Sequence, residues 1–115
     1  YSDEQIQNIP ESMRKLYLQR LDQENWIFTR EVRKEITFRR FNLMNQVFPF
    51  RKPFHIIFCR NVMIYFDVPT RNKLIEKMYQ VTAPGGYLFI GHSESIRTPE
   101  CPYDYIQPAV FRKRE

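Results

Sequence analysis

Two polar side chains, Arg60 and Asn61, directly follow the apolar run Phe54–Cys59. A run of this length that is rich in Ile and Phe predicts a strand buried on both faces, as in the middle of a parallel sheet. Open α/β sheets bind their ligands beyond the carboxyl ends of such strands. An Arg can hold a carboxylate with two hydrogen bonds, and an Asn offers both a donor and an acceptor. We therefore predict a ligand site at the end of this strand.

Three further residues extend the candidate site. Residues 36–41 combine β-formers with arginines, which predicts a strand near a sheet edge, and Asn42 and Leu43 follow it. The ring of Tyr65 could lie beside a cation, and its hydroxyl could hold a carboxylate. Each residue type also has a structural interpretation: an Arg at a strand end can pair with a surface acid, an Asn can close a turn, and Tyr65 can belong to the core.

The stretch His92-Ser93-Glu94-Ser95 contains residue types of nucleophilic catalysis. Adjacent residues in one loop do not have the geometry of a catalytic triad, in which the members come from separate parts of the fold. We interpret this loop as packing beside the site, because it follows the carboxyl end of a predicted strand.

The elements before residue 36 are predicted from local signals. Ser2 and Gln5 fit a capping box at the start of a short helix, which Pro10 ends. A second helix is predicted from Pro10 to about Arg20. Its buried stripe would comprise Met13, Leu16 and Tyr17. The apolar Trp26–Phe28, after a polar turn-like cluster, predicts a short strand or hairpin.

A parallel strand, helix, strand unit is predicted around the candidate site. Asp67 can cap a helix with Pro69 in its first turn. The apolar face of that helix comprises Leu74, Ile75, Met78 and Tyr79. Pro84-Gly85-Gly86 breaks the helix and leads into an apolar strand over residues 87–91, and residues 109–111 form a last strand.

Composition limits the class of protein. With 115 residues, 43% of them hydrophobic, the chain can bury one modest core, and we favour part of a domain. It has no apolar run long enough to span a bilayer and no charged-then-apolar leader, so we expect a cytoplasmic protein without direct membrane insertion. Cys59 and Cys101 lack metal-ligand spacing, which favours structural thiols and no metal. The formal charge of +5 could attract nucleic acid or an acidic protein surface. No nucleic-acid-binding signature accompanies it, so we expect no nucleic acid as a partner.

A linked set of motifs carries a family resemblance. It consists of Asn42-Leu43 and residues 58–66, 84–86 and 91–96. In order and spacing this set resembles the CheR family, S-adenosylmethionine-dependent methyltransferases that esterify glutamates on bacterial chemotaxis receptors. The resemblance implies an α/β fold: the C-terminal half of a Rossmann-like class I methyltransferase sheet, with helices packed on the sheet faces. Residues 1–115 would be the C-terminal part of a single methyltransferase domain, with room for a small β insertion around residues 18–36.

The resemblance also implies a cofactor, a partner and residue roles. The cofactor is S-adenosyl-L-methionine, which leaves as S-adenosyl-L-homocysteine, and the partner is the cytoplasmic domain of chemotaxis receptors. Asn42, Leu43, Arg60 and Asn61 are the implied cofactor-binding residues. Tyr65, beside the transferring methyl group, and Arg60 are the implied catalytic residues.

Two features depart from the family pattern. The glycine-rich donor-binding loop and the acidic residue for the donor ribose are absent, since the glycines are Gly85, Gly86 and Gly91. We therefore expect a longer parent enzyme and an inactive isolated chain. The region around residues 18–36 has no glycine, although some family members grip the receptor tail there with a glycine-containing loop. Two alternatives stay open: a non-catalytic interaction module that keeps the half-fold, and a basic nucleic-acid-binding domain.

The expected strand order predicts an exposed edge. The methyltransferase sheet has the order 3-2-1-4-5-7-6, in which Phe54–Cys59 would be the fourth strand and residues 36–41 the third. The first and second strands have no counterpart in this chain. Phe54–Cys59 would then carry unpaired backbone groups, which are a template for pairing with another chain. We expect either self-association through this edge, or movement of residues 36–41 across to cover it.

Overall fold

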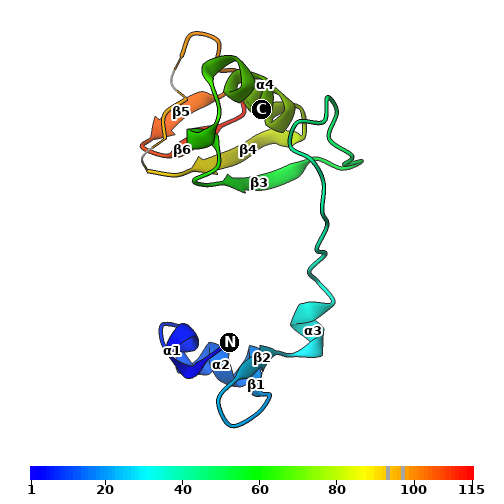
Figure 1. Cartoon of the computed structure of the whole chain (residues 1–115), viewed down its shortest axis with the longest axis vertical. Helices are drawn as coiled ribbons and strands as arrows, with labels where there is room; N and C mark the ends of the chain where they lie inside the picture. The colour runs from blue at the N-terminus through cyan, green and yellow to red at the C-terminus, as the bar shows by residue number, and fades with distance from the viewer. Residues whose placement is uncertain (93, 97) are drawn as a thin grey trace. The chain divides into compact units, whose positions relative to one another are not determined.

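The computed structural model describes residues 1–92, 94–96 and 98–115 (Figure 1). It divides into two compact units, Tyr1–Arg40 and Phe41–Glu115, which we call the first and the second unit. The assignment of all 115 residues to a single methyltransferase domain stays a prediction.

The first unit is a set of short elements around a hairpin. Its elements are α1 (Asp3–Ile6), α2 (Glu11–Tyr17), β1 (Leu18–Arg20), β2 (Trp26–Phe28) and α3 (Arg30–Arg33). The capping box is confirmed, since the Ser2 hydroxyl accepts from the Gln5 N–H and the Gln5 side chain accepts from the Ser2 N–H. The predicted short strand is confirmed as β2, which pairs antiparallel with β1 inside the range 18–36.

The second helix was predicted too long and too buried. It ends at Tyr17, because Leu18 is extended and pairs with Phe28 in the hairpin. Its expected stripe is exposed, with Leu16 67% accessible. The unit is small, and its fully buried apolar side chains among the described residues are Ile6 and Leu18. Tertiary pairing thus overrides helix propensity at the end of α2.

The second unit contains one four-stranded sheet. Its elements are β3 (Phe54–Cys59), the 3₁₀ helix η1 (Met63–Tyr65), α4 (Val68–Gln80), β4 (Thr82–Ile90), β5 (Asp104–Gln107) and β6 (Val110–Arg112). The strand order is β3-β4-β6-β5, with β3 and β4 parallel and the other neighbours antiparallel. The α/β fold class and the parallel strand, helix, strand unit are confirmed, and the order agrees with the last four positions of the expected sheet.

Helix α4 forms where its local signals predict it. The Asp67 carboxylate accepts from the Thr70 N–H at 2.9 Å, which caps the helix, and Pro69 lies in the first turn. The buried face packs against one side of the sheet. That shared core contains Leu74, Ile75, Met78, Leu88, Ile90 and Phe111. The predicted apolar face of α4 is therefore confirmed for its three central residues, while Tyr79 is half-buried.

Strand β4 begins earlier than predicted. Pro84-Gly85-Gly86 lies inside it, because the pairing register shifts between Phe54, opposite Thr82, and Ile56, opposite Tyr87. Gly85 has φ +79°, which an L side chain rarely adopts. The two glycines thus form an irregularity within one strand, which still exchanges backbone hydrogen bonds with Lys113.

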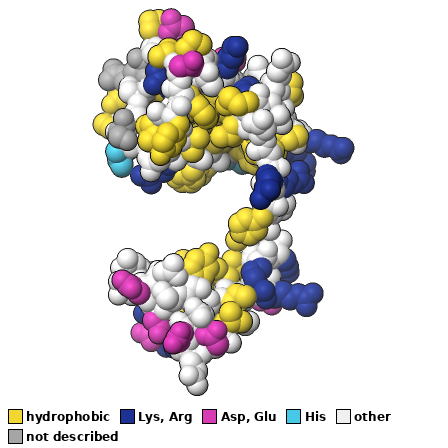
Figure 2. Space-filling model, viewed as in Figure 1, with side chains coloured by type: hydrophobic (Ala, Val, Ile, Leu, Met, Phe, Trp, Pro, Cys, Tyr) yellow, Lys and Arg dark blue, Asp and Glu magenta, His cyan; other side chains and the backbone are white. Residues whose placement is uncertain are grey.

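The prediction that β3 is buried on both faces is wrong. Ile56 is 54% and Phe58 is 68% accessible, and Cys59 is its buried residue. Helix α4 covers one face of the sheet, and the other face carries Phe58 stacked on Phe89 at 4.9 Å. Among the described residues of the second unit, no helix covers this second face. Figure 2 shows apolar side chains gathered on the surface of the second unit.

The strand predicted over residues 36–41 is also wrong. These residues have no regular structure, so they form no strand that pairs with β3. β-formers make a strand only where a partner edge is available, and arginines disfavour such pairing. Among the described residues, β3 pairs with β4 alone. An apolar cavity of about 340 Å³ borders β3, with Phe41, Leu43, Phe50, Ile56, Ile57 and Phe58 among its lining residues.

Candidate functional site

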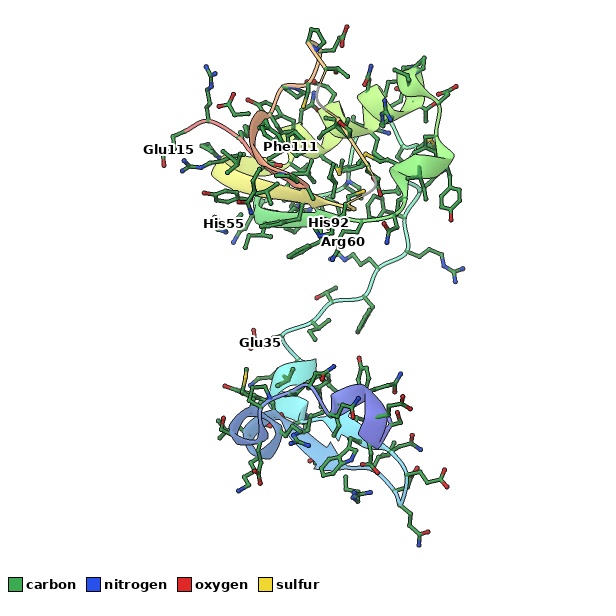
Figure 3. The ribbon with its side chains drawn as sticks, turned by 90° about the vertical axis from the view of Figure 1, so that its left-hand side faces the viewer. Glu35, His55, Arg60, His92, Phe111 and Glu115 are labelled. Atoms are coloured by element: carbon green, nitrogen blue, oxygen red, sulfur yellow. The ribbon has the colours of Figure 1, made fainter. Side chains whose placement is uncertain are left out.

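The carboxyl ends of β3 and β4 bring Arg60, Asn61 and the segment after Gly91 to one edge of the sheet. Cys59 lies opposite Ile90 in the parallel register, so the residues that follow each strand emerge together. Figure 3 shows Arg60 and His92 at this edge. The predicted position of Arg60 and Asn61 after a sheet strand is therefore observed.

Asn61 makes a sharp turn at the end of β3. Its φ is +60°, in the left-handed region that Asn tolerates better than most residues. A Cβ placed on Gly91 would touch the Asn61 side-chain oxygen and would lie 3.2 Å from the Asn61 backbone nitrogen. Gly91 thus leaves the space that the Asn61 side chain needs.

Glu94 completes this edge and was not predicted as a site residue. The Glu94 Oε1 would lie 2.9 Å from a Cβ placed on Gly91. Both carboxylate oxygens of Glu94 are buried and have no hydrogen-bond partner among the described residues. A turn closed by the Glu94 N–H and the Gly91 carbonyl, 3.0 Å apart, places it there. Ser93, which belongs to the same predicted loop, lies outside the described residues. The motif of residues 91–96 was the sequence signal that could have identified Glu94.

Cys59 lies beside this carboxylate. Burial, and secondarily the negative charge of Glu94, raise the pKa of the Cys59 thiol to about 11. The thiol is therefore protonated near neutral pH, which makes it a poor nucleophile. Burial also raises the pKa of Cys101. Both cysteines are free, and the interpretation of two structural thiols stays in place.

Arg60 and Tyr65 are exposed and available to a ligand. Tyr65 ends η1 and is 80% accessible, so the alternative that it belongs to the core is wrong. No described acid forms an ion pair with Arg60, which disfavours a surface salt bridge as its role. Both side chains extend from the segment that follows β3.

Asn42 and Leu43 are not brought to this edge. The Asn42 side chain accepts from the Met44 N–H at 2.9 Å, and the Leu43 carbonyl accepts from Lys77 Nζ at 2.6 Å. Lys77 lies near the end of α4, where the chain returns to the amino end of β3. In Figure 1 the arrowhead of β3 points away from the loop that follows residue 40. Residues 36–41 form no strand, so Asn42 and Leu43 do not follow a strand end as expected, and their donor-binding role stays a prediction.

The arrangement offers polar recognition and no metal site among the described residues. Arg60, Asn61 and the buried Glu94 carboxylate lie on the segments that follow two neighbouring strands, and no described grouping of His, Cys, Asp and Glu could hold a metal ion. The polar groups of this site can orient a polar ligand by charge and hydrogen bonds.

No described helix is long and apolar enough to cross a membrane.

Comparisons with known proteins agree with the motifs. Residues 1–109 match the CheR methyltransferase, SAM binding domain. The chain is 42% identical over 113 residues to a chemotaxis protein methyltransferase of Borreliella burgdorferi, covering 98% of this chain and 40% of that protein. It is 37% identical over 99 residues to chemotaxis protein methyltransferase 2 of Pseudomonas aeruginosa, covering 84% of this chain and 35% of that protein.

A probable chemotaxis protein methyltransferase of Rhizobium etli is 35% identical over 99 residues, which cover 84% of this chain and 37% of that protein. The chain thus spans about 40% or less of the length of these curated relatives. The match to the family covers most of the chain, and with it the residues that follow β3. This chain belongs to the CheR methyltransferase family, within its SAM binding domain.

Proposed function

We propose that this chain is part of a longer enzyme that transfers a methyl group from S-adenosyl-L-methionine to glutamate side chains in the cytoplasmic domain of chemotaxis receptors. The observation that carries the proposal is the pair Arg60 and Asn61, exposed at the carboxyl end of β3 within the matched family domain. We propose a cytoplasmic location, in keeping with that substrate.

The polar groups at this edge fit the donor. S-Adenosyl-L-methionine carries a carboxylate, an ammonium, hydroxyls and an adenine, and Arg60 and Asn61 offer hydrogen-bonding partners for such groups. When bound, the donor supplies a methyl group on a positively charged sulfur. A glutamate carboxylate is already ionised at neutral pH, so no general base is needed. Positioning of the two reactants is then the main task, and it can lower the barrier by about 7–11 kcal/mol.

The individual roles follow from side-chain chemistry. Arg60 would orient a carboxylate with its guanidinium, and Asn61 would hold the donor through its amide. The exposed hydroxyl of Tyr65 would position the attacking carboxylate beside the methyl group. Asn42 and Leu43 would also contact the donor, from a loop that Lys77 fixes by donating to the Leu43 and Asn45 carbonyls.

Substitutions at Asn61 and Tyr65 should separate binding from turnover. In the full-length protein, Asn61→Ala is expected to weaken donor and product binding about tenfold, because a hydrogen bond to the ligand is lost. Tyr65→Phe is expected to lower kcat more than donor affinity, because its hydroxyl acts on the acceptor. Calorimetry and a methyl-transfer assay give the two quantities, with Asn45→Ala and Tyr17→Phe as matched exposed controls. Rates and affinities at wild-type level in both site variants would contradict the assignment.

The 115-residue chain itself should bind the donor weakly or not at all. Its three glycines all lie at or after position 85, and the donor-binding glycine loop of the family has no counterpart here. Titration calorimetry with S-adenosyl-L-methionine is expected to give no saturable heat, and methyl transfer to receptor domains should be absent. The full-length protein serves as the positive control. Micromolar donor affinity of the chain alone would show that the glycine loop is dispensable.

One observation favours the alternative of a non-catalytic interaction module. An apolar cavity of about 600 Å³ in the first unit is lined by Ile9, Pro10, Met13, Tyr17, Phe28 and Val32, among others. Exposed apolar surface of this kind suits protein docking. Donor-dependent methyl-ester formation by the full-length protein distinguishes the two functions, since a docking module would bind receptors without forming the ester.

A further inference from the structure

We infer that Glu94 and Asn61 form an acceptor pair for a cationic N–H group, which the methyl donor carries as its ammonium. Glu94 would then be a binding and positioning residue at the carboxyl end of β4. The inference rests on the proposed methyltransferase function and deepens it by assigning one part of the donor to one place in the fold.

The geometry brings two oxygen acceptors, from Asn61 and Glu94, close to one point beside Gly91, and the Asn61 backbone nitrogen lies 3.2 Å from that point. A Cβ on Gly91 would lie 2.9 Å from Glu94 Oε1 and would also touch the Asn61 side-chain oxygen. Both Glu94 oxygens are buried, and neither has a hydrogen-bond partner among the described residues. Because Gly91 has no side chain, both oxygens approach it closely at the ends of the adjacent strands.

A buried carboxylate without a partner is costly, so the arrangement is expected to be satisfied in the working protein. Packing alone does not explain Glu94, because an apolar side chain would fill the same place without that cost. The neighbouring Cys59 thiol stays protonated near neutral pH and is at best a weak donor. Arg60 directly precedes Asn61 in the sequence, but its guanidinium forms no ion pair with Glu94.

The charge and number of the two acceptors indicate which hydrogen-bond donor would satisfy them. Glu94 belongs to no group of three or more His, Cys, Asp and Glu among the described residues, so the site does not suit a metal ion. Two acceptors, one of them charged, match an ammonium, which has a positive charge and three N–H donors. A hydrogen bond between two charged groups is also stronger than one to a neutral hydroxyl.

The experiment measures ligand affinity of the full-length protein by calorimetry, together with the thermal midpoint of the ligand-free protein. The variant is Glu94→Gln, which keeps the shape of the side chain and removes its charge. Glu100→Gln, an exposed glutamate later in the same connection, is the matched control. The probes are S-adenosyl-L-methionine and 5′-methylthioadenosine, which lacks the amino-acid part and therefore the ammonium.

Glu94→Gln is expected to weaken S-adenosyl-L-methionine binding about 10- to 100-fold, and to leave 5′-methylthioadenosine binding within about twofold. The thermal midpoint of the ligand-free protein should stay the same or rise, because an unpaired buried charge is removed. Glu100→Gln should match wild type throughout.

Unchanged S-adenosyl-L-methionine affinity in Glu94→Gln would overturn the inference. So would an equal loss for both probes, which would place an adenosine group at Glu94. A lower thermal midpoint without ligand would show that a side chain of the protein already pairs with Glu94, and would also overturn it. Failure of the wild-type protein to bind either probe would instead overturn the proposed function itself.

Discussion

Phe58→Lys is expected to convert this chain from a self-associating species into a monomer. β3 is an edge strand whose outer backbone groups pair with no described strand. It carries no Lys, Arg, Asp or Glu, and Ile56 and Phe58 are more than half exposed. Edge strands that avoid pairing usually carry charges, and lysine above all. A second copy is the occupant that this edge fits, because two β3 strands can pair antiparallel about a two-fold axis.

Light scattering on the purified chain tests this prediction. The wild-type chain should show at least twice its monomer mass of 14.1 kDa at micromolar concentration, and Phe58→Lys should show the monomer mass. Ile106→Lys is the control, because Ile106 is exposed on β5 at the opposite edge of the same sheet. A monomeric wild-type chain, or equal effects of the two substitutions, would mean that β3 is not the pairing edge.

Leu74→Ala is expected to destabilise the second unit by about 2–5 kcal/mol, because it leaves a cavity where α4 meets the sheet. Leu74 is 0% accessible and belongs to the same core as Leu88 and Phe111. A domain of this kind is stable by only about 5–15 kcal/mol, so the substitution removes a large share of the stability. Lys73→Ala, on the exposed side of α4, should change the stability by less than about 0.5 kcal/mol.

Urea unfolding followed by far-UV circular dichroism measures this effect. The chain has a single Trp, at position 26 in the first unit, so its fluorescence reports on that unit separately. The dichroism midpoint should fall in Leu74→Ala, whereas the fluorescence midpoint should move less. Equal midpoints in Leu74→Ala and Lys73→Ala would contradict the proposed importance of this core contact.

Local signals predicted the parts of the fold that depend on neighbours in the sequence. The capping box at Ser2 and the cap at Asp67 are hydrogen bonds over three residues, so the residue types suffice to identify them. Strand β5 was not predicted, because its four residues lie between Pro102 and Pro108 and form a strand only against β6. The burial of β3 depends on which elements cover its faces, and a short apolar run does not reveal that.

In the candidate site, too, the residues placed by local sequence were predicted correctly, and those placed by distant contacts were not. Arg60 and Asn61 were placed correctly because they directly follow a strand that the sequence identifies. Asn42 was misplaced because its position depends on a distant contact, the Lys77 side chain on the Leu43 carbonyl. The burial of the Glu94 carboxylate against Gly91 depends on how a loop folds back, which no local pattern specifies. Its membership in a family motif was the available signal.

The position of β4 between β3 and β6 has a consequence for synthesis on the ribosome. The hairpin of β5 and β6 closes through a two-residue turn, whereas the pairing of β3 with β4 must bridge the whole of α4. Closing the longer connection costs more chain entropy. Because translation proceeds from the N-terminus, β3 and α4 leave the ribosome before β4. Strand β4 is the one that pairs with β3 and packs against α4. The nascent chain therefore exposes the apolar strand β3 during that interval, and chaperones that bind extended apolar segments can bind it then.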